Sequence, residues 1–224
     1  MDSVTQAALG AAVGGAVAGR QAGWRAFAIG AGVGTLPDLD GFVSYGGPIA
    51  DFTYHRGYTH GLFIQTLAAP LIAWPLVRWR RRHGETYRRW LLAVWLILIT
   101  HALLDAVTIY GTQLWLPFSD YPVGLGSVFI IDPLYTLPLL IGIGVAAGDL
   151  CRRERWNRAG LVLSTVYLAW AIGAQQVVEQ RAAAAIEREG LAVERMRVTP
   201  APLNTLLWRV VAVGTEAHWE GFYT

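Results

Sequence analysis

Histidine and aspartate residues gather in four short strings of this chain, and their side chains could bind a metal ion. The strings read Leu36-Pro-Asp-Leu-Asp-Gly41, Tyr54-His-Arg-Gly-Tyr-Thr-His60, Thr100-His-Ala-Leu-Leu-Asp105 and Ile130-Ile-Asp-Pro133. Imidazoles and carboxylates without lysine or cysteine are typical ligands of hard to borderline divalent metals such as zinc and manganese. We expect one or two metal ions, and two suit so many groups better than one. The predicted ligands are Asp38, Asp40, His55, His60, His101 and Asp105.

The spacing within the strings can bring these ligands together. His101 and Asp105 are four residues apart, so on a helix they share one face about one turn apart. His55 and His60 flank Gly57, where a turn can fold both imidazoles toward one point. A metal held in this way lowers the pKa of a bound water and polarises a scissile group, which is the chemistry of a hydrolase.

Two further residues each have two interpretations. Arg56, next to His55, could act in catalysis by stabilising a developing anion such as a phosphoryl oxygen, or it could form a salt bridge with Asp38 or Asp51. Asp132 precedes a proline, so it could be a catalytic or metal-binding carboxylate or the N-cap of the helix that follows. The sequence leaves both questions open.

The composition is typical of a membrane protein. Of the 224 residues, 54% are hydrophobic and only 15% are charged, whereas soluble domains are about 25% charged. This excludes a disordered chain, and the net charge of +2 excludes a nucleic-acid binder of the usual kind. The single cysteine excludes a disulfide framework and a cysteine-built zinc site.

Several apolar stretches approach the roughly 20 residues that a spanning helix needs. They cover residues 4–18, 24–36, 61–77, 90–109, 128–148 and 161–178. The first two could instead form a re-entrant hairpin. We therefore predict an all-α membrane protein in which residues 1–178 form a polytopic bundle of about six transmembrane helices, and of no fewer than about four.

Residues 179–224 differ from the bundle in character. Charged residues alternate with alanine over 179–197, which predicts an exposed helix, and residues 206–213 and 219–223 have the branched and aromatic composition of strands. We expect an extracytoplasmic helix followed by a partial β segment. The strand pattern stops at Thr224, which suggests a truncated sequence or a small domain that leans on the bundle.

The arginines predict the orientation of the bundle. All 18 basic residues are arginines, and 12 of them lie in three alternate loops around residues 20–25, 78–89 and 152–158. The positive-inside rule makes these loops cytoplasmic. Both termini and the four histidine and aspartate strings then lie on the outer side, which predicts a metal site at the outer membrane–water boundary.

The same strings resemble those of a known family. The matching segments are Met1-Asp-Ser-Val-Thr-Gln-Ala-Ala-Leu-Gly10, Leu36-Pro-Asp-Leu-Asp40, Tyr54-His-Arg-Gly-Tyr-Thr-His60, Thr100-His-Ala-Leu-Leu-Asp105, Tyr110-Gly-Thr-Gln113 and Ile131-Asp-Pro-Leu-Tyr135. Over about residues 1–150 the chain resembles the YdjM-like, LexA-regulated family of inner-membrane metal-dependent hydrolases. The resemblance implies a polytopic protein of the inner (plasma) membrane with hydrolase activity.

Two departures from the family pattern bear on this resemblance. Many relatives carry histidine where this chain has Gln6, and the amide of Gln6 is a poor metal ligand, so we expect it beside the ligands rather than among them. Some relatives carry an acidic residue where this chain has Gly15. If that acid takes part in the site, its loss here weakens the hydrolase interpretation.

The leading hypothesis is thus a membrane-embedded, metal-dependent hydrolase that acts on a lipid or lipid-linked phosphoester. Its partner would be membrane lipid, and no nucleic acid is expected. One alternative is a metal-ion or proton-coupled transporter, which should carry acidic or histidine residues along a path to the cytoplasmic side. The other is a noncatalytic membrane protein with a structural metal, which predicts a closed coordination shell.

Overall fold

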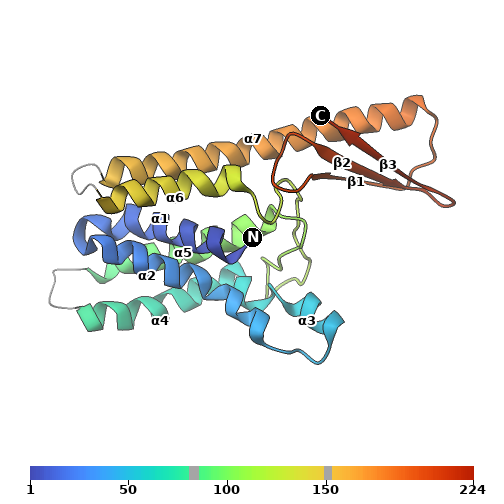
Figure 1. Ribbon diagram of the computed structural model, residues 1–224. Helices are drawn as coiled ribbons and strands as arrows, with labels where there is room; N and C mark the ends of the chain where they lie inside the picture. The colour runs from blue at the N-terminus through green and yellow to red at the C-terminus, as the bar shows by residue number, and fades with distance from the viewer. Residues whose placement is uncertain (81–85, 149–152) are drawn as a thin grey trace.

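A bundle of helices with a small sheet at one end forms the protein (Figure 1). The computed structural model describes residues 1–80, 86–148 and 153–224; residues 81–85 and 149–152, which include parts of two arginine-rich loops, lie outside the described residues. The helices of the bundle are α1 (Ser3–Ala22), α2 (Trp24–Thr35), α4 (Leu62–Arg80), α5 (Tyr87–Ala106), α6 (Pro133–Gly148) and α7 (Arg153–Arg188). Between α2 and α4 lie the 3-10 helix η1 (Pro37–Phe42), the short helix α3 (Pro48–Tyr54) and the 3-10 helix η2 (Tyr58–His60).

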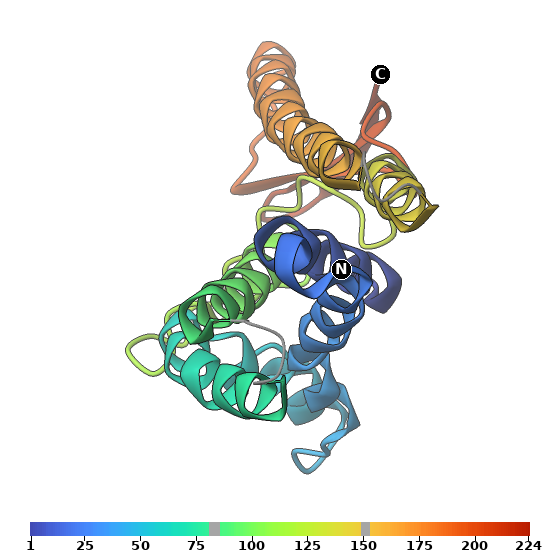
Figure 2. The same ribbon diagram turned by 90° about the vertical axis from the view of Figure 1, so that its left-hand side faces the viewer.

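Helix α1 occupies the centre of the bundle. It packs against α2, α5, α6 and α7, as the view along the helices in Figure 2 shows. Its buried side chains join a common core with residues such as Ile97 of α5 and Leu139 of α6. The end of α5, η1 and η2 lie at the end of the bundle that carries the sheet, whereas the end of α1 and the start of α5 lie at the opposite end (Figure 1).

Glycines allow α1 and α2 to approach each other closely. A Cβ atom on Gly30 would lie only 2.2 Å from the carbonyl oxygen of Gly10, and one on Gly10 would lie 2.3 Å from that of Gly30. The two backbones are therefore in direct contact, as at other small-residue interfaces in membranes. This contact places the end of α2 and the η1 segment beside α5.

We predict that Gly30→Ala destabilises the protein whereas Gly32→Ala does not. A Cβ on Gly32 would meet no described atom within 4 Å, so its replacement should have only the usual benefit of alanine in a helix. At Gly30 the added methyl must push two backbones apart, and overpacking costs about 1–3 kcal/mol. Thermal unfolding in detergent should show a melting temperature lower by roughly 3–10 °C for Gly30→Ala alone. Equal melting temperatures for the two variants would contradict the close contact.

The prediction of about six transmembrane helices is wrong. Among the described residues only α5 and residues 154–188 of α7 are both long and apolar enough to cross a membrane. Helix α2 has 12 residues and α6 has 16, which correspond to about 18 and 24 Å, less than the roughly 30 Å of the hydrocarbon core. The apolar part of α4 is also short, and α1 has the length but not the apolar composition.

The two candidate spans differ in how much of their surface the protein covers. About half of the apolar window of α5 is buried inside the bundle, whereas most of that of α7 is exposed. Large apolar side chains on the outer face of α7 include Val162, Leu163, Val166, Trp170 and Val177. Such a face is suited to contact with lipid.

The all-α prediction is also wrong, because the chain ends in an antiparallel sheet of order β1-β2-β3. Its strands are β1 (Arg195–Pro200), β2 (Trp208–Val213) and β3 (His218–Tyr223). The second and third strands agree with the predicted β segment. The predicted helix over 179–197 is partly wrong: α7 stops before Gly190, whose φ of +63° suits glycine, and β1 follows. Val198 and Trp208 pack on Val178 of α7, which anchors the sheet to the bundle.

Candidate metal centre

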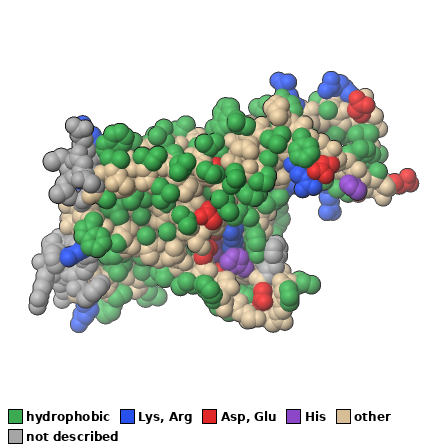
Figure 3. Space-filling model, in the orientation of Figure 1, with side chains coloured by type: hydrophobic (Ala, Val, Ile, Leu, Met, Phe, Trp, Pro, Cys, Tyr) green, Lys and Arg blue, Asp and Glu red, His purple; other side chains and the backbone are tan. Residues whose placement is uncertain are grey.

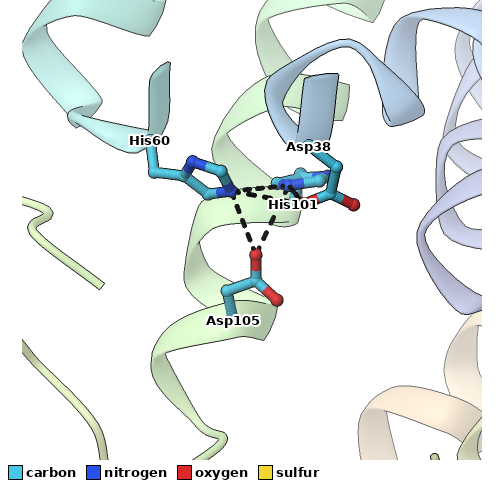
Figure 4. A group of neighbouring side chains, drawn as sticks. All are labelled: Asp38, His60, His101 and Asp105. Carbon is cyan, nitrogen blue, oxygen red and sulfur yellow. Dashed lines mark hydrogen bonds and ion pairs between the residues drawn. The ribbon is translucent and has the colours of Figure 1, made fainter. Parts of the chain in front are cut away.

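Four side chains from three elements meet at the sheet-bearing end of the bundle (Figure 4). Asp38 comes from η1, His60 ends η2, and His101 and Asp105 are one turn apart on α5. Their ligand atoms all lie within 4.8 Å of one another, and the group could hold a metal ion. His60, His101 and Asp105 are buried, and Asp38 keeps 15% of its side chain exposed.

The distances from the imidazole nitrogens to each other and to the carboxylate oxygens are close to those of a tetrahedral site. The two Nε2 atoms of His60 and His101 are 3.0 Å apart. Asp105 Oδ2 lies 3.1 Å from His60 Nε2 and 3.4 Å from His101 Nε2, and Asp38 Oδ1 lies 3.6 and 3.4 Å from the same atoms. In a tetrahedral zinc site with bonds of about 2.0–2.1 Å, neighbouring ligand atoms are separated by about 3.3–3.4 Å.

Hydrogen bonds at the far side of each imidazole determine where its proton lies. His101 Nδ1 is 2.7 Å from the carbonyl oxygen of Gly34, which can only accept, so Nδ1 carries the proton. The Thr59 hydroxyl donates to Asp40, so its oxygen accepts from His60 Nδ1, 2.9 Å away. In the neutral rings both Nε2 atoms therefore present lone pairs to the centre. This is the arrangement by which outer hydrogen bonds orient histidine ligands.

The carboxylates are also prepared to bind a cation. Asp105 Oδ2, the oxygen that faces the group, is buried and accepts no hydrogen bond from the described residues. Its Oδ1 contacts the amino group of Met1 and lies 3.5 Å from the guanidinium of Arg56. Burial alone would raise the pKa of Asp38, but the adjacent imidazoles of His101 and then His60 lower that pKa below its ordinary value. Asp38 is thus ionised at neutral pH.

Asp40 and His55, which we expected among the ligands, lie beside the four-residue group and not in it. Asp40 Oδ2 accepts hydrogen bonds from the Thr59 hydroxyl and from the backbone N–H of Arg56, and its Oδ1 is 2.9 Å from His55 Nδ1. Burial opposes ionisation, but hydrogen bonds from His55 and Thr59 lower the pKa of Asp40 below its ordinary value. Asp40 therefore holds His60 in place through Thr59.

The buried side chain of Arg56 faces Asp105. Besides the 3.5 Å contact with Asp105, its guanidinium donates to the Thr108 hydroxyl and lies over the ring of Tyr110, 4.6 Å from the centroid. The salt bridges suggested by the sequence, to Asp38 or Asp51, are not among those of the described residues. The residue also has a φ of +64°, which allows its N–H to reach Asp40.

Asp132 is the N-cap of α6, and the structure does not bring it to the four-residue group. Its Oδ1 accepts from the N–H of Leu134, its carbonyl accepts from the N–H of Thr136, and its Oδ2 accepts from the Tyr167 hydroxyl. A carboxylate before proline at the start of a helix has this capping geometry. The alternative of a catalytic or metal-binding role has no geometric support in the described residues.

We predict that Asp132→Ala costs about 1–2 kcal/mol of stability, as loss of a helix cap does, and leaves metal binding unchanged. The melting temperature in detergent should fall by a few degrees. Metal content, measured by mass spectrometry on the same sample, should equal that of the wild type. A loss of metal in this variant would instead show that Asp132 contributes to metal binding.

The two departures from the family pattern lie in different places. Gln6 is fully buried, and its Nε2 donates to the backbone carbonyl of His101, so it contacts a ligand residue from behind. Gly15 is nine residues, or about 14 Å, further along α1, where a Cβ would meet the ring of Phe27 at 2.4 Å. A larger residue at Gly15 would require the Phe27 ring to move, and the position lies well along α1 from Gln6.

Sequence inspection did not reveal three groups that support the ligands. They are the Gly34 carbonyl, the Thr59 hydroxyl and the Thr108 hydroxyl. A backbone carbonyl has no signal in the residue types. Thr59 adjoins His60 in one of the strings and could have been found there.

A hollow of about 460 Å³ opens beside the group. Its lining includes Asp40, His55, Tyr110 and the exposed side chains of Phe42 and Val43. Histidine and acidic side chains lie together on the face shown in Figure 3. The four ligands are not among the residues that line the hollow, but Asp40, which does line it, accepts a hydrogen bond from Thr59, the hydrogen-bond partner of His60.

Comparison with known proteins gives one family. The family described as YdjM inner membrane protein matches residues 1–178, which include all four ligand residues and exclude the sheet. No curated protein and no solved structure matches the chain.

Proposed function

Because the chain belongs to the YdjM inner membrane protein family, we propose that it is a membrane hydrolase that uses a divalent metal bound by Asp38, His60, His101 and Asp105. One observation carries the proposal: the Nε2 atoms of two imidazoles lie 3.0 Å apart, and each lies 3.1 to 3.6 Å from an oxygen of both carboxylates. Imidazole nitrogens and carboxylate oxygens gathered in this way match the ligands that divalent metals such as zinc take. Asp105 Oδ2 is buried and faces this group, 3.1 Å from His60 Nε2 and 3.4 Å from His101 Nε2.

We propose zinc as the metal, and one ion in place of two. Zinc accepts imidazole and carboxylate ligands in tetrahedral geometry, whereas manganese prefers a larger set of oxygen ligands. Each of the four residues offers one ligand atom, and these four atoms lie within 4.8 Å of one another, while Asp40 and His55 are paired with each other. When bound, the ion would supply a water of lowered pKa and would polarise the scissile group.

A lipid or lipid-linked phosphoester is the proposed substrate. The rim of the hollow and the neighbouring segment expose large apolar side chains: Phe42, Val43, Ile49, Tyr54 and Tyr58. Exposed apolar surface beside a polar hollow suits a molecule with a polar headgroup and acyl chains. In this arrangement His55 and Tyr110 face the headgroup, and Arg56 keeps Asp105 oriented and has no direct contact with substrate.

We propose that the metal end faces the outer side of the membrane. Helices α5 and α7, the two candidate spans, both start at the end of the bundle where the arginines gather. Arginine-rich segments remain cytoplasmic by the positive-inside rule. The four ligands, at the opposite end, would then lie near the outer headgroups.

A structural metal is the second candidate, because four protein ligands can fill a tetrahedral shell. The partial exposure of Asp38 favours catalysis, since a less constrained carboxylate can yield a position to water. Cobalt in place of zinc distinguishes the two. If the site is catalytic, adding phosphate should change the visible absorption of the cobalt protein, whereas a closed shell predicts no change.

The proposal is tested by hydrolysis of defined lipids. The zinc-loaded full chain is incubated in detergent with phospholipids and lipid diphosphates, and products are identified by mass spectrometry. We expect a product that appears with the wild type and with His218→Ala, in which an exposed strand residue is changed, and is absent with His101→Ala. Equal product from the wild type and His101→Ala would exclude the site as the source of activity.

A further inference from the structure

A second cavity lies at the opposite end of the bundle from the metal centre. It has a volume of about 520 Å³ and lies between the end of α1, the start of α5 and the start of α7. Its charged lining consists of four arginines and one acid, namely Arg20, Arg88, Arg89, Arg158 and Glu154. Arginine side chains are visible at the left-hand end of the surface in Figure 3.

The charges in this cavity are not balanced. Glu154 accepts from Arg20 at 2.8 Å and also pairs with Arg158. Arg88 and Arg89 form no ion pair with the described residues. The lining therefore has a positive excess that an anion would neutralise, and the planar guanidinium is well suited to binding phosphate through two hydrogen bonds.

The backbone adds to the attraction for an anion. Thr86, the N-cap of α5, lines the cavity and makes no capping hydrogen bond through its side chain within the described residues. The N-terminus of a helix presents unpaired N–H groups and the positive end of the helix dipole. Arg88 and Arg89 lie in this first turn, so the guanidinium groups and the helix end act at the same place.

The position of the cavity suggests the kind of molecule that carries the anion. Both candidate spans start here, the helix α5 at Tyr87 and the candidate span within α7 at Glu154. The cavity thus lies where the hydrocarbon core of a membrane would give way to headgroups. Val17 and Leu92 form an apolar part of its wall, which suits the glycerol and upper acyl chain of a lipid.

We propose that this cavity binds the phosphate group of an anionic phospholipid, independently of the metal centre. Arg88 and Arg89 bind the phosphate, Arg20 and Arg158 are held at the rim by Glu154, and the apolar wall contacts the lipid below its headgroup. The site would fasten the arginine-rich end of the bundle to one leaflet.

The test measures thermal stabilisation of the full chain in a zwitterionic detergent by three probes: dioctanoyl phosphatidylglycerol, dioctanoyl phosphatidylcholine and inorganic phosphate. The variant is Arg88→Gln/Arg89→Gln.

The matched control for this variant is Arg25→Gln/Arg155→Gln, which removes two exposed arginines at the same end that do not line the cavity. Melting temperatures without probe show whether each variant folds, and Arg88→Lys/Arg89→Lys keeps the charge but loses the paired hydrogen bonds.

We expect phosphatidylglycerol to stabilise the wild type and the control equally and to bind the Arg88→Gln/Arg89→Gln variant at least about tenfold more weakly. The lysine variant should lie between them, and phosphatidylcholine should bind more weakly than phosphatidylglycerol throughout. If inorganic phosphate alone shows the same dependence on Arg88 and Arg89, the anion site stands and its ligand is a soluble phosphate. Equal stabilisation of the variant and the control by phosphatidylglycerol and by phosphate would overturn the proposal.

Discussion

Replacing His101 by alanine is expected to reduce the metal content of the purified protein from about one ion per chain to nearly none. His101 supplies one of the four converging atoms, and its Nε2 lies 3.0 Å from that of His60. Without it the remaining three ligands lose both a bond and the tetrahedral geometry, which together account for much of the affinity of a zinc site. Metal content is measured by inductively coupled plasma mass spectrometry after dialysis.

Two further variants, one at a second ligand and one at an exposed histidine, serve as comparisons for this experiment. His60→Ala removes a second ligand from a different element and should give the same loss. His218→Ala changes an exposed histidine on β3 and should retain the metal. Circular dichroism establishes that each variant is helical. A wild type without stoichiometric metal, or a His101→Ala variant that keeps it, would exclude the proposed centre.

The second large effect is expected for Thr59→Val, which keeps the shape of the side chain and removes its hydroxyl. That hydroxyl accepts from His60 Nδ1 and donates to Asp40. Loss of such an outer hydrogen bond typically weakens metal binding about 10- to 100-fold. Affinity is measured by competition with a chelator of known zinc affinity.

The matched control for Thr59→Val is Thr165→Val on α7. Its hydroxyl is exposed and donates only to the backbone carbonyl of Leu161 among the described residues. We expect zinc affinity to be unchanged there. If Thr59→Val binds zinc as tightly as the wild type, the chain from Asp40 through Thr59 does not orient His60, and Asp40 would need another role.

Four of the residues singled out by the motifs, Asp38, His60, His101 and Asp105, lie together in a group that could hold a metal ion. His101 and Asp105 share a helix face because any helix aligns residues four apart, and α5 is a strong apolar helix. The arginine pattern correctly separated the basic end from the end that carries the ligands. The family resemblance is confirmed over residues 1–178.

The number of membrane spans could not be read from the apolar stretches. The apolar stretches run on beyond the helices, but helices α2 and α6 themselves have only 12 and 16 residues. Apolar residues there also serve as helix-packing surface, as the Gly10–Gly30 contact shows. Hydropathy alone does not distinguish a residue that faces lipid from one that faces another helix.

The sequence by itself determined which chemistry is available: imidazoles and carboxylates, no cysteine ligand set, and a separate population of arginines. Only the tertiary structure determined which of these imidazoles and carboxylates lie next to one another. Asp38 and Asp40 are two residues apart on η1, and because a 3-10 helix turns about 120° per residue, they point in different directions. Asp38 therefore meets the imidazoles, while Asp40 binds Thr59 and Asp132 caps α6. The residue type determines which ligands a side chain can bind, whereas the fold of the backbone determines which other side chains lie close enough for it to contact.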